Sequence, residues 1–306
     1  MTKVFIDGSA GTTGLRIYDR LTLRKDISLL TLPDELRKNN EAKAEMLNKA
    51  DVAFLCLPDA AAKESVTLVT NSNTVIIDTS TAHRTDAGWT YGFPELVGYD
   101  KIKNSKRIAN PGCHASGFVA LVKPLVDAGI INTVTQLTCF SLTGYSGGGK
   151  GMIAEYESQD VNPLYKAPRQ YGLSQQHKHL KEMSAVTGLE FAPAFCPIVA
   201  PFYSGMEVTV PLFKNQLNGG IEQIKDIYKN TYRNGLVTFS DNMHEDGFIS
   251  ACALSGKDDM QISVFGNEDR IILVSRFDNL GKGASGAAIQ NMNIVIGADE
   301  TEGLSI

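Results

Sequence analysis

Residues 3–15 read KVFIDGSAGTTGL, in which a short apolar run is followed by glycines three residues apart at Gly8, Gly11 and Gly14. The apolar run predicts a strand over 3–6, and the residues from 14 to 22 predict a helix. Strand, glycine-rich turn and helix in this order are typical of a dinucleotide site. Glycines let the backbone approach a pyrophosphate, and N–H groups at a helix start attract its charge. The alternative is a tight turn in which glycines supply only positive φ angles.

The residues after this turn continue to alternate short apolar runs with helical stretches, which favours the nucleotide interpretation. Strands are predicted over 27–32, 52–57 and 75–78, and helices over 41–48 and 60–71. Short loops between such elements indicate parallel strands joined by crossover helices, as in a Rossmann-type sheet. The turn residues that we expect to contact the nucleotide are Gly8, Ser9, Gly11, Thr12, Thr13 and Gly14.

The character of the chain changes after residue 110. A helix is predicted over 115–128, and alternating strands over 133–142, 206–212 and 271–277 predict an antiparallel sheet with one covered face. Helices are also predicted over 221–232 and 283–295. We therefore predict an α/β chain of two domains, with boundaries at 1–112 and 113–282. The C-terminal segment from about 283 to 306 packs back on the first domain in this prediction.

Composition and charge exclude several classes of protein. The chain has 306 residues and 43% hydrophobic content, which is ordinary for a globular protein. A net charge of −5 with scattered basic residues argues against nucleic-acid binding. We expect neither a signal peptide nor a membrane span, because no apolar run approaches the ~20 residues that a membrane helix needs. Five cysteines without a CxxC pair or a disulfide framework favour the reducing cytoplasm.

The residues at the end of the second predicted strand should decide whether NAD or NADP binds. An acidic residue there would accept the ribose 2′-hydroxyl of NAD, and a basic residue would accommodate the 2′-phosphate of NADP. The chain has both, because Asp34 and Glu35 stand beside Arg37 and Lys38. The spacing leaves NAD and NADP open, and a solvated loop is the alternative to both.

Cys113 stands directly after a Pro-Gly pair, in the segment NPGCHASG at 110–117. A thiol at a helix N-terminus has its thiolate stabilised by the helix dipole and by free amides, so Cys113 is the candidate nucleophile. A buried helix-start cysteine is the alternative. The other four cysteines have the apolar surroundings of small buried hydrophobes, and they are Cys56, Cys139, Cys196 and Cys252.

A thiolate that attacks a carbonyl needs a proton donor, and histidine suits that role near neutral pH. His177 and His179 are the candidates, with Ser174 as a possible helix cap before them. Residues two apart on a helix point in different directions, so we expect only one of the two to face the site. The pair could also be half of a metal site, but no third ligand is suitably spaced, so we predict no metal. His114, next to Cys113, is a candidate orienting neighbour.

Three further polar segments complete the constellation. Residues 80–84 follow the fourth predicted strand, where open α/β sheets bind ligands, and Arg84 could clamp a phosphate or carboxylate. The glycine-rich loop 144–151 could line the cofactor, although a hinge or a hairpin turn is the alternative. Residues 278–286 open the last helix and could present amides to an anion.

Taken together, the motifs resemble those of the N-acetyl-γ-glutamyl-phosphate reductases of arginine biosynthesis, in the shorter of two subfamilies. The motifs that carry the resemblance span most of the chain, and they are GSAGTTGL (8–15), DTSTAHR (78–84), YGFPEL (91–96), NPGCHASG (110–117), GYSGGGKG (144–151), HKHLKEM (177–183) and DNLGKGASGAAIQNMN (278–293). The NPGC element and the last motif are specific in combination, whereas the N-terminal glycines alone would prove little.

The resemblance implies a fold, a reaction and roles. The fold would be an NADP-binding domain plus an α+β substrate and dimerisation domain of the semialdehyde dehydrogenase type, assembled as a homodimer or homotetramer. The reaction would reduce an acyl phosphate through a cysteine thioester with release of inorganic phosphate. Cys113 falls on the nucleophile and His177 with His179 on the acid-base motif. The remaining assignments are Arg37, Ser146, Gly147, Asn279 and Gly283 to the cofactor, and Ser80, Arg84 and Asn110 to the substrate or its phosphate.

Two alternatives remain open. The same chemistry could act on another acyl phosphate, such as aspartyl phosphate or a carrier-bound amino-adipyl phosphate, because substrate choice depends on pocket side chains that a sequence does not place. A dinucleotide-sensing protein without catalysis is the alternative from another class. Such a protein should lack the nucleophile, whereas Cys113 is present in its motif.

Overall fold

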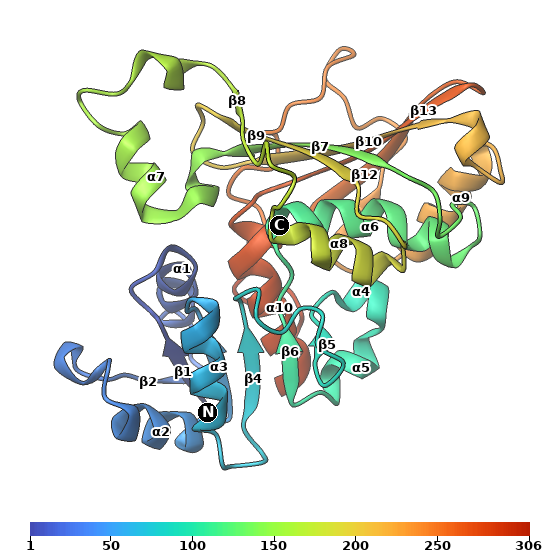
Figure 1. The fold of residues 1–306 in the computed structure, drawn as a ribbon. Helices are drawn as coiled ribbons and strands as arrows, with labels where there is room; N and C mark the ends of the chain where they lie inside the picture. The colour runs from blue at the N-terminus through green and yellow to red at the C-terminus, as the bar shows by residue number, and fades with distance from the viewer. The chain divides into compact units, whose positions relative to one another are not determined.

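The computed structural model describes residues 1–306, which form two compact units (Figure 1). The first unit consists of Met1–Gly112 and Ala284–Leu304, and the second of Cys113–Gly283 and Ser305–Ile306. No helix has both the length and the apolar character that crossing a membrane requires.

The first unit is built on a six-stranded sheet in the order β2-β1-β3-β4-β6-β5, and every pairing in it is parallel. Its strands are β1 (Thr2–Asp7), β2 (Ile27–Leu30), β3 (Val52–Leu55), β4 (Val75–Asp78), β5 (Thr90–Tyr91) and β6 (Arg107–Ala109). The Rossmann-type parallel sheet predicted from the alternating pattern is therefore confirmed. Strands β5 and β6 were not predicted, because two or three residues are too short for a periodic signal.

Helices cover both faces of this sheet, which explains why β3 and β4 are apolar without alternation. They are α1 (Thr12–Leu21), α2 (Asn40–Lys49), α3 (Asp59–Thr67), α4 (Pro94–Val97), α5 (Tyr99–Lys103) and α10 (Gly286–Ile296). On one face, α1 and α10 supply Ile17 and Met292 to a core cluster with Phe54. On the other face, Leu47 of α2 and Ala62 of α3 pack with Phe5 and other strand residues.

The second unit is built on a seven-stranded sheet in the order β11-β12-β13-β10-β7-β9-β8. Its strands are β7 (Thr138–Gly144), β8 (Arg169–Gln170), β9 (Ala194–Ala200), β10 (Met206–Phe213), β11 (Val237–Phe239), β12 (Met260–Gly266) and β13 (Arg270–Phe277). The predicted antiparallel sheet is corrected to a mixed one, because β7 pairs with β9 and β11 pairs with β12 in parallel. Strand β9 lies too far along the chain from β7 for local pattern to reveal the direction of this pairing.

Helices α6 (Cys113–Asp127) and α8 (His179–Thr187) lie along one side of this sheet (Figure 1), and α9 (Ile221–Thr231) packs on β12 and α6. The inward residues of β10 are fully buried, as the alternating pattern predicted. The lack of a side chain at Gly117 allows α6 to pack close to the sheet. A Cβ at this position would lie 2.4 Å from Cγ2 of Val208 and 2.8 Å from Oγ of Ser275.

A single turn of π-helix, Gly281–Ser285, leads into α10. The helix predicted over 283–295 therefore begins three residues later than expected, at Gly286. The short helical turns of the remaining chain are η1 (Asp34–Leu36), η2 (Tyr145–Gly148), η3 (Pro163–Lys166) and η4 (Lys214–Gln216), and α7 spans Gly149–Tyr156.

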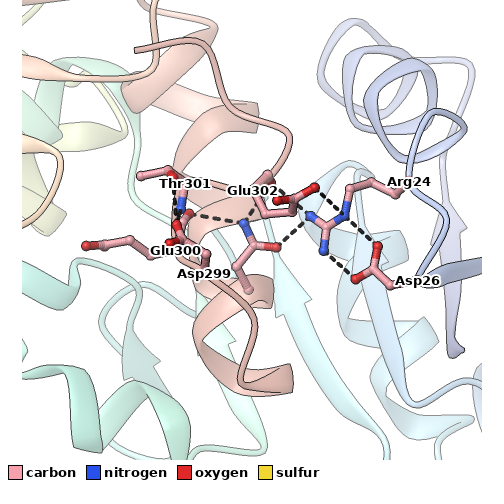
Figure 2. Close-up of polar contacts among 7 residues, drawn as sticks. Arg24, Asp26, Asp299, Glu300, Thr301 and Glu302 are labelled. Carbon is pink, nitrogen blue, oxygen red and sulfur yellow. Dashed lines mark hydrogen bonds and ion pairs between the residues drawn. The ribbon is translucent and has the colours of Figure 1, made fainter.

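A buried arginine ties the C-terminal segment to the first unit (Figure 2). The Arg24 side chain is 3% exposed and donates from Nε and Nη2 to the carboxylate of Asp26 at 2.8 and 2.6 Å. Its Nη1 donates to Oδ1 of Asn293 in α10 at 2.9 Å and to the carbonyl oxygen of Glu302 at 2.8 Å. One side chain thus joins the start of β2, the last helix and the segment after it.

We expect Arg24→Met to lower the free energy of unfolding by about 2–4 kcal/mol, measured by urea denaturation. The substitution keeps the apolar stem but leaves the buried Oδ1 of Asn293 and the part-buried carbonyl oxygen of Glu302 without this donor. Lys25→Met, at the exposed neighbouring position, is the matched control and should stay within about 0.5 kcal/mol of the parent chain. Equal stability of the two variants would contradict a structural role for Arg24.

Candidate functional site

The three glycines of the first turn differ in what the fold demands of them. Gly8 has a φ of +90°, and a Cβ there would lie 2.3 Å from the carbonyl oxygen of Cys56. A Cβ on Gly14 would lie 2.3 Å from the carbonyl oxygen of Gly8. At Gly11 the nearest atom would be 3.5 Å away, an ordinary contact. The fold therefore explains Gly8 and Gly14, whereas at Gly11 a Cβ would fit in ordinary van der Waals contact, so packing does not require a glycine there.

Gly11 is also the N-cap of α1, and no side chain caps the first turn of that helix. The turn follows β1, which lies between β2 and β3 in the sheet. The chain order reverses at this point, and open α/β sheets bind ligands outside the carboxyl ends of such strands. Uncapped amides, an open position at Gly11 and this place in the sheet fit the pyrophosphate of a dinucleotide.

Asp7, the last residue of β1, is a buried acid that the sequence motifs did not single out. Its Oδ2 accepts from Oγ of Ser65 at 2.8 Å and lies 3.9 Å from Nζ of Lys43, which is itself buried. Burial raises the pKa of Asp7, and the Ser65 hydrogen bond and the Lys43 charge oppose that rise. The only sequence signal for this residue is its position directly before Gly8.

The loop after β2 places Arg37 and Asp34 in contact, with Nη2 of Arg37 2.7 Å from Oδ1 of Asp34. The side chains of Arg37 and Asp34 are 44% and 82% exposed, so either can meet a ligand without rearrangement of a core. The assignment of Arg37 to a 2′-phosphate remains a prediction.

The loop after β4 is held together by its own polar side chains. Asp78 is fully buried and accepts from the amide of Ser80 at 2.9 Å, from Oγ of Ser80 at 2.8 Å and from His83, whose Nδ1 is 2.6 Å away. Arg84 donates from Nη2 to the carbonyl oxygen of Thr79 and from Nε to that of Asn110, both at 2.9 Å. Ser80 and Arg84 thus hold this loop in its conformation. Their contact with the substrate stays a prediction.

Asn110 connects the NPGC segment to the last helix within the first unit. Its Nδ2 donates to the carbonyl oxygen of Ala284 at 3.0 Å, and its side chain is 1% exposed. Asn110 is therefore a structural link between the NPGC segment and the start of the last helix. Its contact with the substrate or its phosphate stays a prediction.

Cys113 is the first residue of α6 and is partly exposed. Gly283 lies against it, because a Cβ on Gly283 would be 3.0 Å from Cβ of Cys113. The predicted position of the thiol at a helix N-terminus is therefore confirmed, and it favours the thiolate. By contrast, burial raises the pKa of Cys56 to about 12 and also raises the pKa of Cys139. The expectation of a buried cysteine is wrong for Cys252, which is exposed.

The two histidines of the HKH segment come together, contrary to the expectation that only one would face a given site. Their ring centroids are 4.8 Å apart, and each lies 5.6 Å from the ring of His114, next to Cys113. The expectation failed because α8 begins only at His179, so His177 precedes the helix and helical geometry does not apply to the pair. Ser174 is not the helix cap either, since the N-cap is Lys178.

The His177 ring has a defined protonation state. Its Nδ1 accepts from the amide of His179 at 3.2 Å, so the proton of the neutral ring is on Nε2. Burial and the nearby Lys178 charge lower the pKa of His177, which favours that neutral form. His177 is partly exposed and His179 is 5% exposed, so His177 is the more accessible donor.

Two hydroxyl side chains beside His114 have no sequence signal. Nδ1 of His114 lies 2.6 Å from Oγ of Ser141 on β7, and Nε2 lies 2.6 Å from the hydroxyl of Tyr171. These residues are 27 and 57 positions away from His114 along the chain, so only the fold brings them together.

Within the second unit, the glycine-rich loop and the segment before α10 meet. Nδ2 of Asn279 donates to Oγ of Ser146 at 2.9 Å, and Oδ1 of Asn279 accepts from the amide of Gly205 at 3.0 Å. Gly147 is exposed next to this pair, where a Cβ would be 3.6 Å from Nδ2 of Asn279. The structure thus places Ser146, Gly147 and Asn279 together. No cluster of three or more histidine, cysteine, aspartate or glutamate side chains could hold a metal ion.

Comparisons with known proteins agree with this arrangement. Residues 8–105 match the family model of the semialdehyde dehydrogenase NAD binding domain, and residues 113–279 match that of the semialdehyde dehydrogenase dimerisation domain. Aspartate semialdehyde dehydrogenase II from Vibrio cholerae, solved as a complex with ASA, has a TM-score of 0.71 at 16% identity, covering 97% of this chain and 98% of the other. A likeness at that identity concerns the fold.

Curated relatives are much closer in sequence. The chain is 44% identical to N-acetyl-gamma-glutamyl-phosphate reductase 2 of a Nostoc species, over 99% of both chains. It is 43% identical to N-acetyl-gamma-glutamyl-phosphate reductase of Sinorhizobium medicae, over 97% of this chain and 99% of the relative. With a full-length relationship at this identity, the chain belongs to the N-acetyl-gamma-glutamyl-phosphate reductase family.

Proposed function

We propose that the chain is an NADPH-dependent reductase that converts N-acetyl-glutamyl 5-phosphate into N-acetyl-glutamate 5-semialdehyde and inorganic phosphate in arginine biosynthesis. The observation that carries this proposal is the 44% identity to a named reductase over nearly the whole chain. A partly exposed thiol at a helix start, with two histidine rings close to its neighbour His114, supports the chemistry. Five free cysteines support a location in the reducing cytoplasm.

Cys113 supplies the covalent route. Its thiolate attacks the carbonyl carbon of the acyl phosphate, the carbon–oxygen bond to phosphate breaks, and a thioester to Sγ remains. NADPH, when bound, supplies the hydride that reduces the thioester carbon. His177 donates from Nε2 to the oxygen that becomes negative in each addition, because its Nδ1 already accepts from a backbone amide. Release of the semialdehyde breaks the carbon–sulfur bond and restores the thiolate.

The two units divide the work in this proposal. The first unit binds NADP through the amides that follow Gly11, with Arg37 at the 2′-phosphate. The second unit carries the nucleophile, the histidines, and the residues Ser146, Gly147, Asn279 and Gly283 for the nicotinamide side. Ser80, Arg84 and Asn110 contribute to substrate binding at the carboxyl end of β4 and at the NPGC segment.

The second sheet offers a surface for self-association. The side away from α6 carries apolar side chains that remain partly or largely exposed, and we define this open face as Phe140, Leu142, Cys196, Ile198, Pro211 and Ile272. Phe140 and Ile272 are 44% and 40% exposed. A contiguous apolar patch on a sheet is typical of a protein interface. We therefore propose that two copies pair through the open face into a homodimer, which could pair again into a homotetramer.

The activity test uses the reverse direction, with N-acetyl-glutamate 5-semialdehyde, inorganic phosphate and NADP, and follows NADPH by absorbance. We expect activity that requires all three, and a loss of at least about a thousandfold in Cys113→Ser. Cys252→Ser, which removes an exposed thiol, is the matched control and should keep full activity. Turnover of aspartate semialdehyde in place of the acetylated substrate would keep the mechanism and replace the substrate. Activity in Cys113→Ser would refute the covalent route.

The proposed contact of Gly11 with the pyrophosphate is tested with Gly11→Ala. We expect NADPH binding to weaken at least about tenfold, or about 1.4 kcal/mol, because the new methyl group occupies space that the pyrophosphate needs. Stability should fall by only about 1 kcal/mol or less. Gly14→Ala is the contrasting variant, in which contact with the Gly8 carbonyl should lower the melting temperature. Isothermal titration and thermal melts measure both effects, and unchanged affinity in Gly11→Ala would place the cofactor elsewhere.

The open face is tested with Phe140→Arg, which places a charge at its centre. We expect sedimentation equilibrium at micromolar concentration to show a dimer or tetramer for the parent chain and a monomer for the variant. Phe191→Arg changes a phenylalanine that is 46% exposed but lies outside the strands, so it should keep the parent mass. A parent chain that sediments as a monomer would exclude this interface.

A further inference from the structure

His114 is a buried imidazole held between two hydroxyl groups. It is 4% exposed, and Ser141 and Tyr171 lie 2.6 Å from its two ring nitrogens. Burial, together with the neighbouring His177 ring, lowers the pKa of His114 to about 3, so the ring is neutral at physiological pH. A neutral imidazole has one N–H donor and one acceptor nitrogen. One of the hydroxyls must therefore donate to the ring, while the other accepts from it.

The burial of Ser141 decides which groups donate in the hydrogen-bond network of Ser141, His114 and Tyr171. Ser141 is 0% exposed, and its hydrogen bond is to Nδ1 of His114. If Nδ1 carried the proton, the serine proton would be buried without an acceptor, which costs about 1–3 kcal/mol. Ser141 therefore donates to Nδ1, and the proton of His114 is on Nε2. Nε2 then donates to the Tyr171 oxygen, so the proton of Tyr171 remains available for another acceptor.

The surroundings of His114 limit what that acceptor can be. Three rings face His114, with centroids 5.4 to 5.6 Å from its own. They are His177 just before α8, His179 at the start of α8, and Phe195 from β9. The titratable groups among its neighbours are these two histidines, Tyr171 and the adjacent Cys113. Tyr171 and Cys113 are both neighbours of His114, because the Tyr171 hydroxyl lies 2.6 Å from its Nε2 and Cys113 directly precedes it at the start of α6. In keeping with this placement, burial and then the charge of Cys113 raise the pKa of Tyr171.

We propose that Tyr171 donates a hydrogen bond to the negative charge at the Cys113 site, and that His114 and Ser141 are positioning residues that keep its proton free for this purpose. The proposal deepens the proposed function, on which its kinetic consequence rests. A hydroxyl donor stabilises the thiolate before attack, and a fixed donor costs no reorganisation during the reaction.

The test measures the rate at which iodoacetamide alkylates Cys113 as a function of pH, followed by mass spectrometry of the Cys113 peptide. We expect Tyr171→Phe to raise the apparent pKa of the thiol by about one unit. Ser141→Ala should move the apparent pKa of the thiol much less, because a proton on Nδ1 of His114 would then be buried without an acceptor and the proton therefore stays on Nε2. The double variant Tyr171→Phe/Ser141→Ala should therefore match Tyr171→Phe alone.

The matched control is Tyr232→Phe, which also removes a tyrosine hydroxyl bonded to α6, here to the carbonyl oxygen of Ala120 at 2.6 Å. It should lower the melting temperature as Tyr171→Phe does, without moving the alkylation profile. An unchanged profile in Tyr171→Phe, or a rise in Ser141→Ala as large as that in Tyr171→Phe, would overturn the proposal.

A second measurement needs no substitution. Nitrogen-15 NMR of histidine-labelled protein should show His114 neutral from pH 5 to 9 with its proton on Nε2. A proton on Nδ1 would contradict the inference that Nε2 of His114 donates to Tyr171. Neither measurement uses the acyl-phosphate substrate. If the parent chain fails to reduce N-acetyl-glutamyl 5-phosphate while the thiol pKa shifts as expected, the proposed substrate fails and the Tyr171 donor stands. In an active parent, Tyr171→Phe should lower kcat about tenfold or more with little change in KM.

Discussion

The close approach of helix α6 to its sheet is the constraint on which the catalytic half of the molecule depends. Gly117 permits it, because any side chain there would overlap Val208 and Ser275. Only at this spacing can His114, at the start of the helix, reach Ser141 on β7 at 2.6 Å. The same packing fixes Cys113 at the first position of the helix, against Gly283. Because Gly117 and Gly283 have no side chains, α6 can pack in the place that positions the nucleophile Cys113.

Polar side chains around the candidate site are mostly committed to holding the backbone in shape. Asp78 binds the loop that follows its own strand, and Arg84 joins that loop to the carbonyl oxygen of Asn110. Asn279 joins the amide of Gly205 to the hydroxyl of Ser146 in the second unit. Loops fixed in this way present backbone amides and a few accessible groups in defined places, which is the preorganisation that charge stabilisation requires. Exposed groups such as Arg37 are free of this constraint and can follow a ligand.

The sequence predicted those parts of the structure that depend on neighbours along the chain. The alternating pattern before residue 80 predicted β1 to β4 and the helices between them, because each strand is a short apolar run, buried throughout in β3 and β4. The Pro-Gly pair and the small residues after it predicted the start of α6 at the thiol. Pairings between distant segments had no such signal. The parallel pair β7 and β9, the contacts of His114 with Ser141 and Tyr171, and the buried Lys43 beneath Asp7 all depend on tertiary structure. The geometry of His177 and His179 was misjudged because a boundary error of a few residues moved His177 out of the helix.

The return of the chain through α10 has a consequence for how the protein is made. Ile289 and Met292 of α10 belong to the core cluster that covers one face of the first sheet. During synthesis, residues 1–112 leave the ribosome long before these side chains exist. The unit that is translated first therefore keeps part of one apolar face of its sheet uncovered until α10 emerges. The second unit, which apart from its last two residues is the single stretch Cys113–Gly283, has its own core complete earlier.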